Sequence, residues 1–209
     1  MPLPEKSMKH EACLSRFVFV FILLLYAIYT ILYTLHPGDS AAAILEFAPG
    51  ILAVCLLCST GSSLRDCYLR FAPLSRKGLT LLALSTLFMP VVLLTGRWQG
   101  WSGMRGLVYA PASGISQELF FRAALLPALM MVFRTNPRTA LIVHALLFAA
   151  WHLPTAVLAA PAPAVVGIAV VTTINGILWG KQVQHDGTVM WVMIYHSLLL
   201  SVTSLFLWE

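Results

Sequence analysis

The residues of this chain that could do acid–base chemistry lie inside long apolar runs. Glu118 and Arg122 share the run 107–133, and His152 and His196 lie in two later runs. On a helix, residues four apart share a face, so Glu118 and Arg122 can form an ion pair. Carboxylates and imidazoles are among the side chains that serve most often as general acids and bases. The pattern indicates a set of proton-transferring groups that folding must bring together.

The composition indicates that these residues lie in a membrane. Of 209 residues, 59% are hydrophobic and 10% are charged, and the mean hydropathy is +0.85. A soluble protein of this length needs more charge to cover its surface. A disordered chain, a secreted disulfide scaffold and an ordinary cytosolic enzyme are therefore excluded.

Seven apolar runs approach the length that crosses a bilayer, which is about 20 residues. We therefore expect an all-α fold, a polytopic bundle of about seven transmembrane helices that forms a single membrane domain over residues 1–209. Within it, residues 1–113 are expected to form the N-terminal spans and residues 114–209 the motif-bearing core. The expected spans cover residues 17–35, 41–58, 78–95, 107–133, 139–157, 162–180 and 188–208.

The Lys and Arg residues predict how the spans are oriented. With a cytoplasmic N-terminus, the inner connections hold ten of them and the outer connections hold only Arg97 and Arg105. Membrane proteins carry this excess of positive charge on the cytoplasmic side. The net charge of +5 is thus explained by topology, and no nucleic-acid partner is expected. The first run is longer than the apolar part of a signal peptide, so we interpret it as a retained anchor.

Three smaller patterns predict local features. The Trp- and Gly-rich segment 98–111 is expected to be interfacial or re-entrant. The G-x-x-x-G step of Gly176 and Gly180 predicts close helix packing. Cys55 and Cys58 are interpreted as small buried hydrophobic residues, because no histidine partners lie near them in the sequence.

Depth in the membrane links the three main ionisable residues. Counting at 1.5 Å per helical residue puts Glu118, His152 and His196 in the central third of three different spans. Such groups cost about 2.5–3.5 kcal/mol each at a helix centre, so they tend to face a cavity and to serve a function. A polar chamber is the expected result. A structural reading also stands, in which Glu118 and Arg122 form an ion pair that only holds helices together and each histidine is a packing residue.

These residues also match the motifs of a known family. The segment 117–122, QELFFR, resembles the E-E-x-x-x-R motif of the CPBP family, which contains CAAX proteases and bacteriocin-processing enzymes. Residues 148–152, FAAWH, match its F-x-x-x-H motif, and His196 stands where its third motif, H-x-x-x-N, begins. The resemblance covers roughly residues 114–209 in the family's order and spacing. It implies an intramembrane endopeptidase of the glutamic type that cleaves a membrane-associated peptide or protein tail.

The resemblance also implies a role for each motif residue. In the family, the first Glu and the histidine of the second motif activate water, and the second Glu and the Arg support the site. The histidine and asparagine of the third motif stabilise the oxyanion of the intermediate, as donors aimed at a carbonyl oxygen do. Carried over to this chain, the implied catalytic residues are Gln117, Glu118, Arg122, His152 and His196.

Two positions depart from the family pattern. Gln117 stands where the motif has its first Glu, and an amide cannot act as a base. Leu200 stands where the third motif has Asn, while Ser201 is turned about 100° away on the helix. Asn175 could supply an amide from the run 162–180. Glu118 could take over as base with a different helix rotation or through a water molecule.

The departures keep two other functions open. One is a catalytically silent relative that acts as a peptide-binding or immunity factor. The other is a small proton or ion transporter whose path uses the buried Glu, Arg and His residues.

The expected cofactors and partners follow from the same residues. Glu118, His152 and His196 could ligate zinc, but the spacing H-E-x-x-H is absent, so we expect metal-free chemistry and no cofactor. The expected partners are the lipid bilayer and a peptide or protein substrate tail. The expected location is the bacterial inner (plasma) membrane, as a multi-pass protein.

Overall fold

The computed structural model describes residues 5–35, 40–90, 97–98 and 100–207. The fold is a bundle of helices, so the all-α prediction is confirmed. Two short strands, β1 (Arg97–Trp98) and β2 (Phe206–Leu207), pair in antiparallel fashion. The helices are α1 (Glu5–Leu35), α2 (Ser40–Ser59), α3 (Arg76–Leu84), α5 (Gly100–Phe120), α6 (Leu126–Val132), α7 (Pro137–Ala159), α8 (Ala162–Asp186) and α9 (Met190–Ser204), with the π-helical turn η1 (Phe121–Leu125) between α5 and α6.

The helices have the length and surface of a membrane protein. Four segments are long and apolar enough to cross a bilayer: Arg16–Leu35, Tyr109–Val132, Pro137–Ala159 and Ala162–Asp186. Two shorter apolar helices cover Leu45–Ser59 and Met190–Ser204. Large apolar side chains on the outside, such as Phe17, Leu146, Leu158 and Leu198, are more than half exposed. Lipid tails can cover such a surface, whereas water cannot do so without cost.

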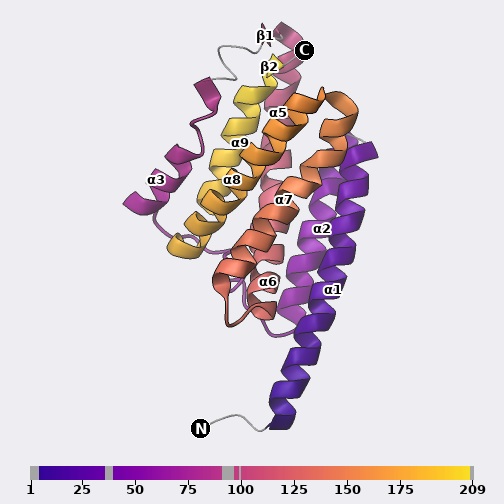
Figure 1. Cartoon of the computed structure of the whole chain (residues 1–209), viewed down its shortest axis with the longest axis vertical. Helices are drawn as coiled ribbons and strands as arrows, with labels where there is room; N and C mark the ends of the chain where they lie inside the picture. Colours follow the sequence, from indigo (N-terminus) through magenta and orange to yellow (C-terminus); the bar gives the residue numbers. More distant parts are fainter. Residues whose placement is uncertain (1–4, 36–39, 91–96, 99, 208–209) are drawn as a thin grey trace.

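The helices pack with α7 against α8, α5 against α9, and α2 against α5. Figure 1 shows α1 along one edge of the bundle, α3 at the opposite edge, and α5 behind the layer of α7, α8 and α9. A Cβ atom at Gly114 would lie 2.9 Å from the backbone of Ser197, and one at Gly176 would lie 2.8 Å from the Cα of Ala145. Glycine therefore lets α5 approach α9, and α8 approach α7. The close packing predicted from Gly176 is confirmed.

The helix that carries the first motif is one continuous rod with a widened turn. α5, η1 and α6 follow one another without a break, and the N–H of Leu126 donates to the carbonyl of Phe121 across five residues. A single π turn of this kind is frequent at functional sites. Residues 100–111 form the first turns of this rod, so the segment expected to be interfacial or re-entrant is helical over these residues.

The expected span 78–95 is the other difference from the sequence prediction. α3 ends at Leu84, and residues 91–96 lie outside the described part of the chain. Ser85 donates its hydroxyl to the carbonyl of Leu82 over 2.6 Å, and Thr86 donates to that of Ala83 over 2.6 Å. Such side-chain bonds compete with the helical pattern. The apolar run therefore does not form one continuous helix over residues 78–90.

Candidate active site

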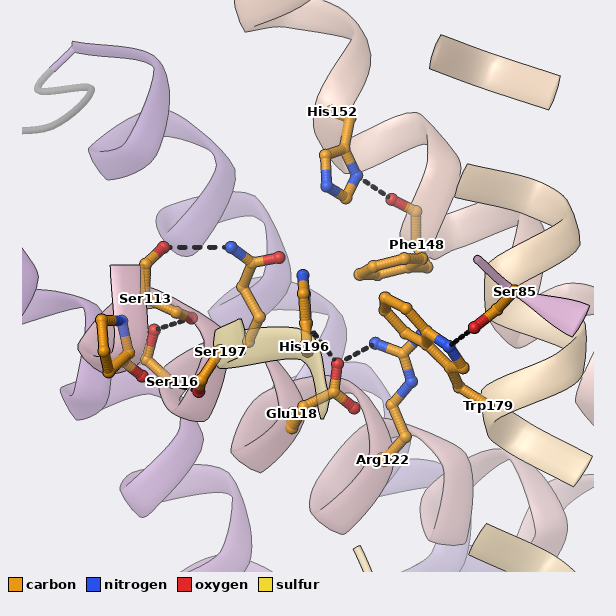
Figure 2. A network of polar contacts seen from close by, with 12 residues as sticks. Ser85, Ser113, Ser116, Glu118, Arg122, Phe148, His152, Trp179, His196 and Ser197 are labelled. Atoms are coloured by element: carbon orange, nitrogen blue, oxygen red, sulfur yellow. Dashed lines mark hydrogen bonds and ion pairs between the residues drawn. The ribbon is translucent and has the colours of Figure 1, made fainter. Parts of the chain in front are cut away.

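Glu118 is the centre of a buried polar cluster. Its side chain is fully buried on α5, and one oxygen, Oε1, accepts two hydrogen bonds. The guanidinium of Arg122 donates over 3.0 Å, and Nδ1 of His196 on α9 donates over 2.7 Å (Figure 2). A buried charge is tolerated only when it is paired and hydrogen-bonded. The predicted pairing of Glu118 with Arg122, and its meeting with His196, are both present.

Arg122 is held by aromatic rings as well as by the carboxylate. The carbon of its guanidinium lies 3.9 Å from the ring centroid of Phe148 and 5.1 Å from that of Trp179. A cation over an aromatic face is stabilised by the ring quadrupole, most strongly where water is excluded. Arg122 lies in the π turn and is fully buried. Phe148 of the second motif therefore supports the arginine of the first motif.

His196 has a defined orientation. Because a carboxylate only accepts, the Nδ1 atom that faces Glu118 carries the proton. Nε2, on the other side of the ring, is not part of this bond. The ring lies 4.6 Å from that of Trp179. Trp179 in turn donates its Nε1–H to the hydroxyl of Ser85 over 2.9 Å. The end of α3 therefore holds the tryptophan that supports His196.

His152 is oriented by its own helix. Its Nδ1 lies 2.8 Å from the carbonyl oxygen of Phe148, and this oxygen only accepts, so the proton is on Nδ1 and Nε2 is left as an acceptor. The Phe148 ring lies 4.7 Å from the His152 ring and 6.3 Å from the His196 ring. Figure 2 shows both imidazoles beside Phe148. His152 and His196 thus meet at one aromatic ring, whereas the carboxylate of Glu118 is directed to His196.

Gln117 belongs to a second polar cluster. Its amide nitrogen donates to the hydroxyl of Ser113 over 3.0 Å, and its oxygen is buried with no protein partner in the described structure. The hydroxyl of Ser116 lies 3.3 Å from Glu46 of α2 and 3.1 Å from the hydroxyl of Tyr29 of α1. Glu46 is 4% exposed. A buried carboxylate thus lies beside the helix in which Gln117 stands at the position of the family's first Glu.

A groove opens beside the cluster, between α5 and α9. It has a volume of about 440 Å³ and is lined by Pro111, Ile115, Met193, Ile194, Ser197 and Leu198 among others. Ser197 follows His196 in the chain and donates to the carbonyl of Pro111 over 3.2 Å. Ile194 and Leu198 are about half exposed, so the groove faces the lipid. An apolar segment lying in the membrane has the chemistry to enter it.

Three other polar residues, Asn175, Ser201 and His144, lie near the cluster without a described hydrogen bond to Glu118. Asn175 is buried on α8, one turn before Trp179 and therefore on the face that carries it. Ser201 donates its hydroxyl to the carbonyl of Ser197 over 2.8 Å, so its proton is already engaged. His144 is fully buried against the Phe121 ring, 6.4 Å away. Its two ring nitrogens have no hydrogen-bond partner within the described residues.

The possible metal ligands of the cluster do not converge on one point. Among the residues that the structure describes, no three His, Cys, Asp or Glu side chains are placed to hold a metal ion. Glu118 and His196 are in contact with each other, and His152 is bonded to its own backbone instead. The zinc set considered from the sequence is therefore not assembled in this geometry.

Three residues around the cluster were not predicted as part of the site: Trp179, Ser85 and Glu46. Trp179 lies between the two glycines of the G-x-x-x-G step. Close helix packing was expected there, but a role in the site was not. Ser85 lies in what was expected to be a plain span. Glu46 is a single acid near the start of an apolar run. Only the penalty of burying a polar group in a membrane could have singled out Glu46.

The fold and the cluster define a class: a helical integral membrane protein with a buried Glu–Arg–His set. Residues 98–201, about half of the chain, match the model of the family described as type II CAAX prenyl endopeptidase Rce1-like. The chain therefore belongs to the Rce1-like family, and the resemblance to CPBP proteases is confirmed. The match includes Glu118, Arg122, His152 and His196. Comparisons with curated proteins and with solved structures gave no match.

Proposed function

We propose that this protein is an intramembrane endopeptidase that hydrolyses a peptide bond in a membrane-associated peptide or protein tail. The observation that carries the proposal is the bond between Glu118 and His196 over 2.7 Å, made at full burial between two helices and beside His152. A carboxylate that fixes one imidazole nitrogen leaves the other directed at substrate, as in a Ser-His-Asp triad. Family membership supports the reaction class.

The base in this proposal is His152. Its Nδ1–H is held by the carbonyl of Phe148, so Nε2 is free to take a proton from water. The water oxygen attacks the carbonyl carbon of the scissile bond, and the carbonyl oxygen becomes an oxyanion. His152 then gives its proton to the departing amine as the C–N bond breaks. Gln117 cannot remove a proton, but its unpartnered Oε1 can accept a hydrogen bond from the same water.

The oxyanion is stabilised by His196 in this proposal. When His196 is protonated, Nδ1 donates to Glu118 and Nε2 donates to the developing negative oxygen. Arg122, Glu118 and protonated His196 then carry a net charge of about +1, which the oxyanion neutralises. Asn175, on the same face of α8 as Trp179, is the candidate for the amide that Leu200 does not provide.

The substrate enters along the apolar groove between α5 and α9. The groove faces the lipid, and its lining includes Ser197, which follows His196 in the chain. An apolar anchor in the groove would bring an attached peptide to the cluster without leaving the membrane. This route supports a membrane-bound substrate over a soluble one.

The test is cleavage of a quenched fluorescent peptide with an apolar anchor by the purified protein in liposomes. We expect His152→Ala and His196→Ala each to lower the rate at least 100-fold. The matched control is His185→Ala, because His185 is exposed near the end of α8 and should leave the rate unchanged. Equal rates for His152→Ala and the wild type would refute the mechanism.

A second candidate function rests on Gln117. Without the first Glu, the protein could hold peptide tails without hydrolysing them, as a binding or immunity factor. In that case the wild type shows no cleavage of any anchored peptide, and Gln117→Glu creates it. Binding of the peptide by a wild type that lacks activity would favour this candidate.

A further inference from the structure

A second cavity lies at the other end of the rod from the cluster. It has a volume of about 610 Å³ and opens between the α2–α3 loop and the ends of α6 and α8. Three arginines line it: Arg65 and Arg70 from the loop, and Arg134 from just beyond α6. Among the described residues of the lining, the acid is Asp66. Nε of Arg134 donates to the carbonyl of Met131 over 3.2 Å. The loop arginines Arg65 and Arg70 alone outnumber Asp66, so the loop side of the cavity is positively charged.

The acid in the lining is turned to its own loop. Asp66 accepts hydrogen bonds from the backbone N–H and the hydroxyl of Ser63, over 2.8 and 2.6 Å. These bonds lower the pKa of the Asp66 carboxyl below its usual range. Asp66 is therefore a carboxylate whose Oδ2 accepts both bonds from its own loop.

The loop is tied to the start of α9, and these ties hold Arg70 in place. Nε of Arg70 donates to the carbonyl of Gly187 over 2.7 Å, and the hydroxyl of Thr188 donates to the carbonyl of Arg70 over 2.5 Å. The N–H of Val189 donates to the carbonyl of Tyr68 over 3.1 Å. Tyr68 adopts a positive φ of 57°, a costly conformation for a non-glycine residue. The strain and the bonds together indicate a preformed site.

The surroundings put the cavity at the level of lipid headgroups. Leu64 and Phe71, which adjoin Arg65 and Arg70 in the chain, are 56% and 81% exposed. Large apolar side chains beside arginines are typical of the membrane interface, where they enter the lipid while the cations meet the headgroups. Pro127, Met130 and Met131 add an apolar wall. The loop also lies on the side that the charge distribution predicts to be cytoplasmic.

The cavity is separate from the candidate active site. Pro127 and Met131 follow Glu118 by nine and thirteen residues on the same rod. At 1.5 Å per residue, they lie about 14 and 20 Å further along the axis. A molecule in this cavity therefore does not contact the Glu118 cluster through its charged end.

We propose that this arginine pocket binds the phosphate of an anionic glycerophospholipid headgroup. Arginine donors form paired hydrogen bonds with phosphate oxygens, and basic pockets between helices at the inner membrane surface have the chemistry to bind such headgroups. The apolar wall receives the upper part of an acyl chain. The ammonium group of a zwitterionic headgroup would be repelled by Arg65 and Arg70, so an anionic lipid is the preferred ligand.

The test uses the delipidated full-length protein in detergent and measures binding of single lipids by native mass spectrometry. We expect phosphatidylglycerol to bind at least tenfold more tightly than phosphatidylcholine. Arg65→Gln and Arg134→Gln should each weaken phosphatidylglycerol binding about fivefold and leave phosphatidylcholine unchanged. The matched control is Arg138→Gln, because Arg138 is an exposed arginine of the first turn of α7 outside the pocket lining; it should bind like the wild type.

Three outcomes would overturn the proposal. One is equal binding of the two lipids, and another is a loss in Arg138→Gln as large as in the pocket variants. The third is displacement of phosphatidylglycerol by millimolar inorganic phosphate, which would make the pocket a site for soluble anions. The melting temperature without lipid shows whether each variant is folded. If Arg134→Gln fails to fold, Arg65→Gln alone decides the result, because Arg65 is exposed.

Discussion

His196 and Glu118 are joined by a 2.7 Å hydrogen bond although 78 residues separate them in the chain. The bond connects α9 with α5, the two helices that also border the apolar groove. It therefore fixes the position of a candidate oxyanion donor relative to the path of the substrate. The proposed chemistry depends on this contact more than on any other.

The first prediction concerns the charge of Glu118. Glu118→Gln leaves Arg122 as a buried cation with no anionic partner, so we expect a loss of about 3 kcal/mol in stability and of at least 100-fold in cleavage. The measurements are chemical unfolding in detergent and peptide cleavage in liposomes. The double variant Glu118→Gln/Arg122→Met should regain most of the stability but no activity. If it regains activity too, Glu118 has only a structural role.

The second prediction concerns the approach of α5 and α9. A Cβ atom at Gly114 would lie 2.9 Å from the backbone of Ser197, so Gly114→Ala should push the helices apart and lengthen the Glu118–His196 bond. We expect cleavage to fall about tenfold or more and the melting temperature to drop. The control is Gly167→Ala on α8, where no atom lies within 4 Å; there alanine should be neutral or slightly stabilising. An unchanged rate in Gly114→Ala would contradict the prediction.

The third prediction concerns the bond between Trp179 and Ser85. Trp179→Phe and Ser85→Ala should each reduce stability, and the double variant should show a coupling of about 1 kcal/mol. Because Trp179 supports the His196 ring, both variants should also lower kcat more than they raise KM. A double-mutant cycle on unfolding free energies, with cleavage kinetics on the same variants, measures this. Strict additivity would mean that the hydrogen bond makes no net contribution.

The fourth prediction concerns the missing amide. If Asn175 supplies the second oxyanion donor, Asn175→Ala should lower kcat about 100-fold. Leu200→Asn restores the family residue one turn after His196, so in the Asn175→Ala background it should recover part of the loss. Steady-state cleavage of the anchored peptide by the wild type and these two variants gives the answer. A wild-type rate in Asn175→Ala would remove Asn175 from the mechanism.

The fifth prediction concerns Cys67 in the loop of the arginine pocket. Cys67 is fully buried, and burial with a contribution from Cys58 raises the pKa of its thiol to about 12. The reactive thiolate is therefore nearly absent at pH 7.5, and maleimide should modify Cys67 only after denaturation. Leu64→Cys, at an exposed position of the same loop, should react within minutes. Rapid labelling of Cys67 in the native protein, followed by mass spectrometry, would show that the loop opens.

The sequence predicted the parts of the site that depend on helical period and on depth. The pairing of Glu118 with Arg122 follows from a spacing of four, and the meeting of Glu118 with His196 follows from similar depths in their spans. The early end of α3 could not be read from its apolar run, because it depends on the hydroxyls of Ser85 and Thr86 turning back to the helix. Hydropathy does not record that competition.

Other features depend on contacts between helices distant in the chain. The position of Trp179 over Arg122 and His196 requires knowing how α8 rotates against α5. The proximity of Ser116 to Glu46 likewise requires the packing of α2. Neither helix rotation can be derived from the spacing of residues along the chain. Trp179 and Glu46 were therefore not predicted as part of the site.

The widened turn at residues 121–125 sets the rotational phase between the two halves of the rod. A π turn holds one residue more than an α turn, so everything after it is rotated by about 100° relative to an uninterrupted helix. Before the turn, α5 directs Glu118 to α9. After the turn, α6 directs Met130 and Met131 to the cavity beside the α2–α3 loop. Deleting one residue from this turn would rotate α6 relative to α5, so the contacts of Glu118 with α9 and of α6 with the α2–α3 loop could not both form.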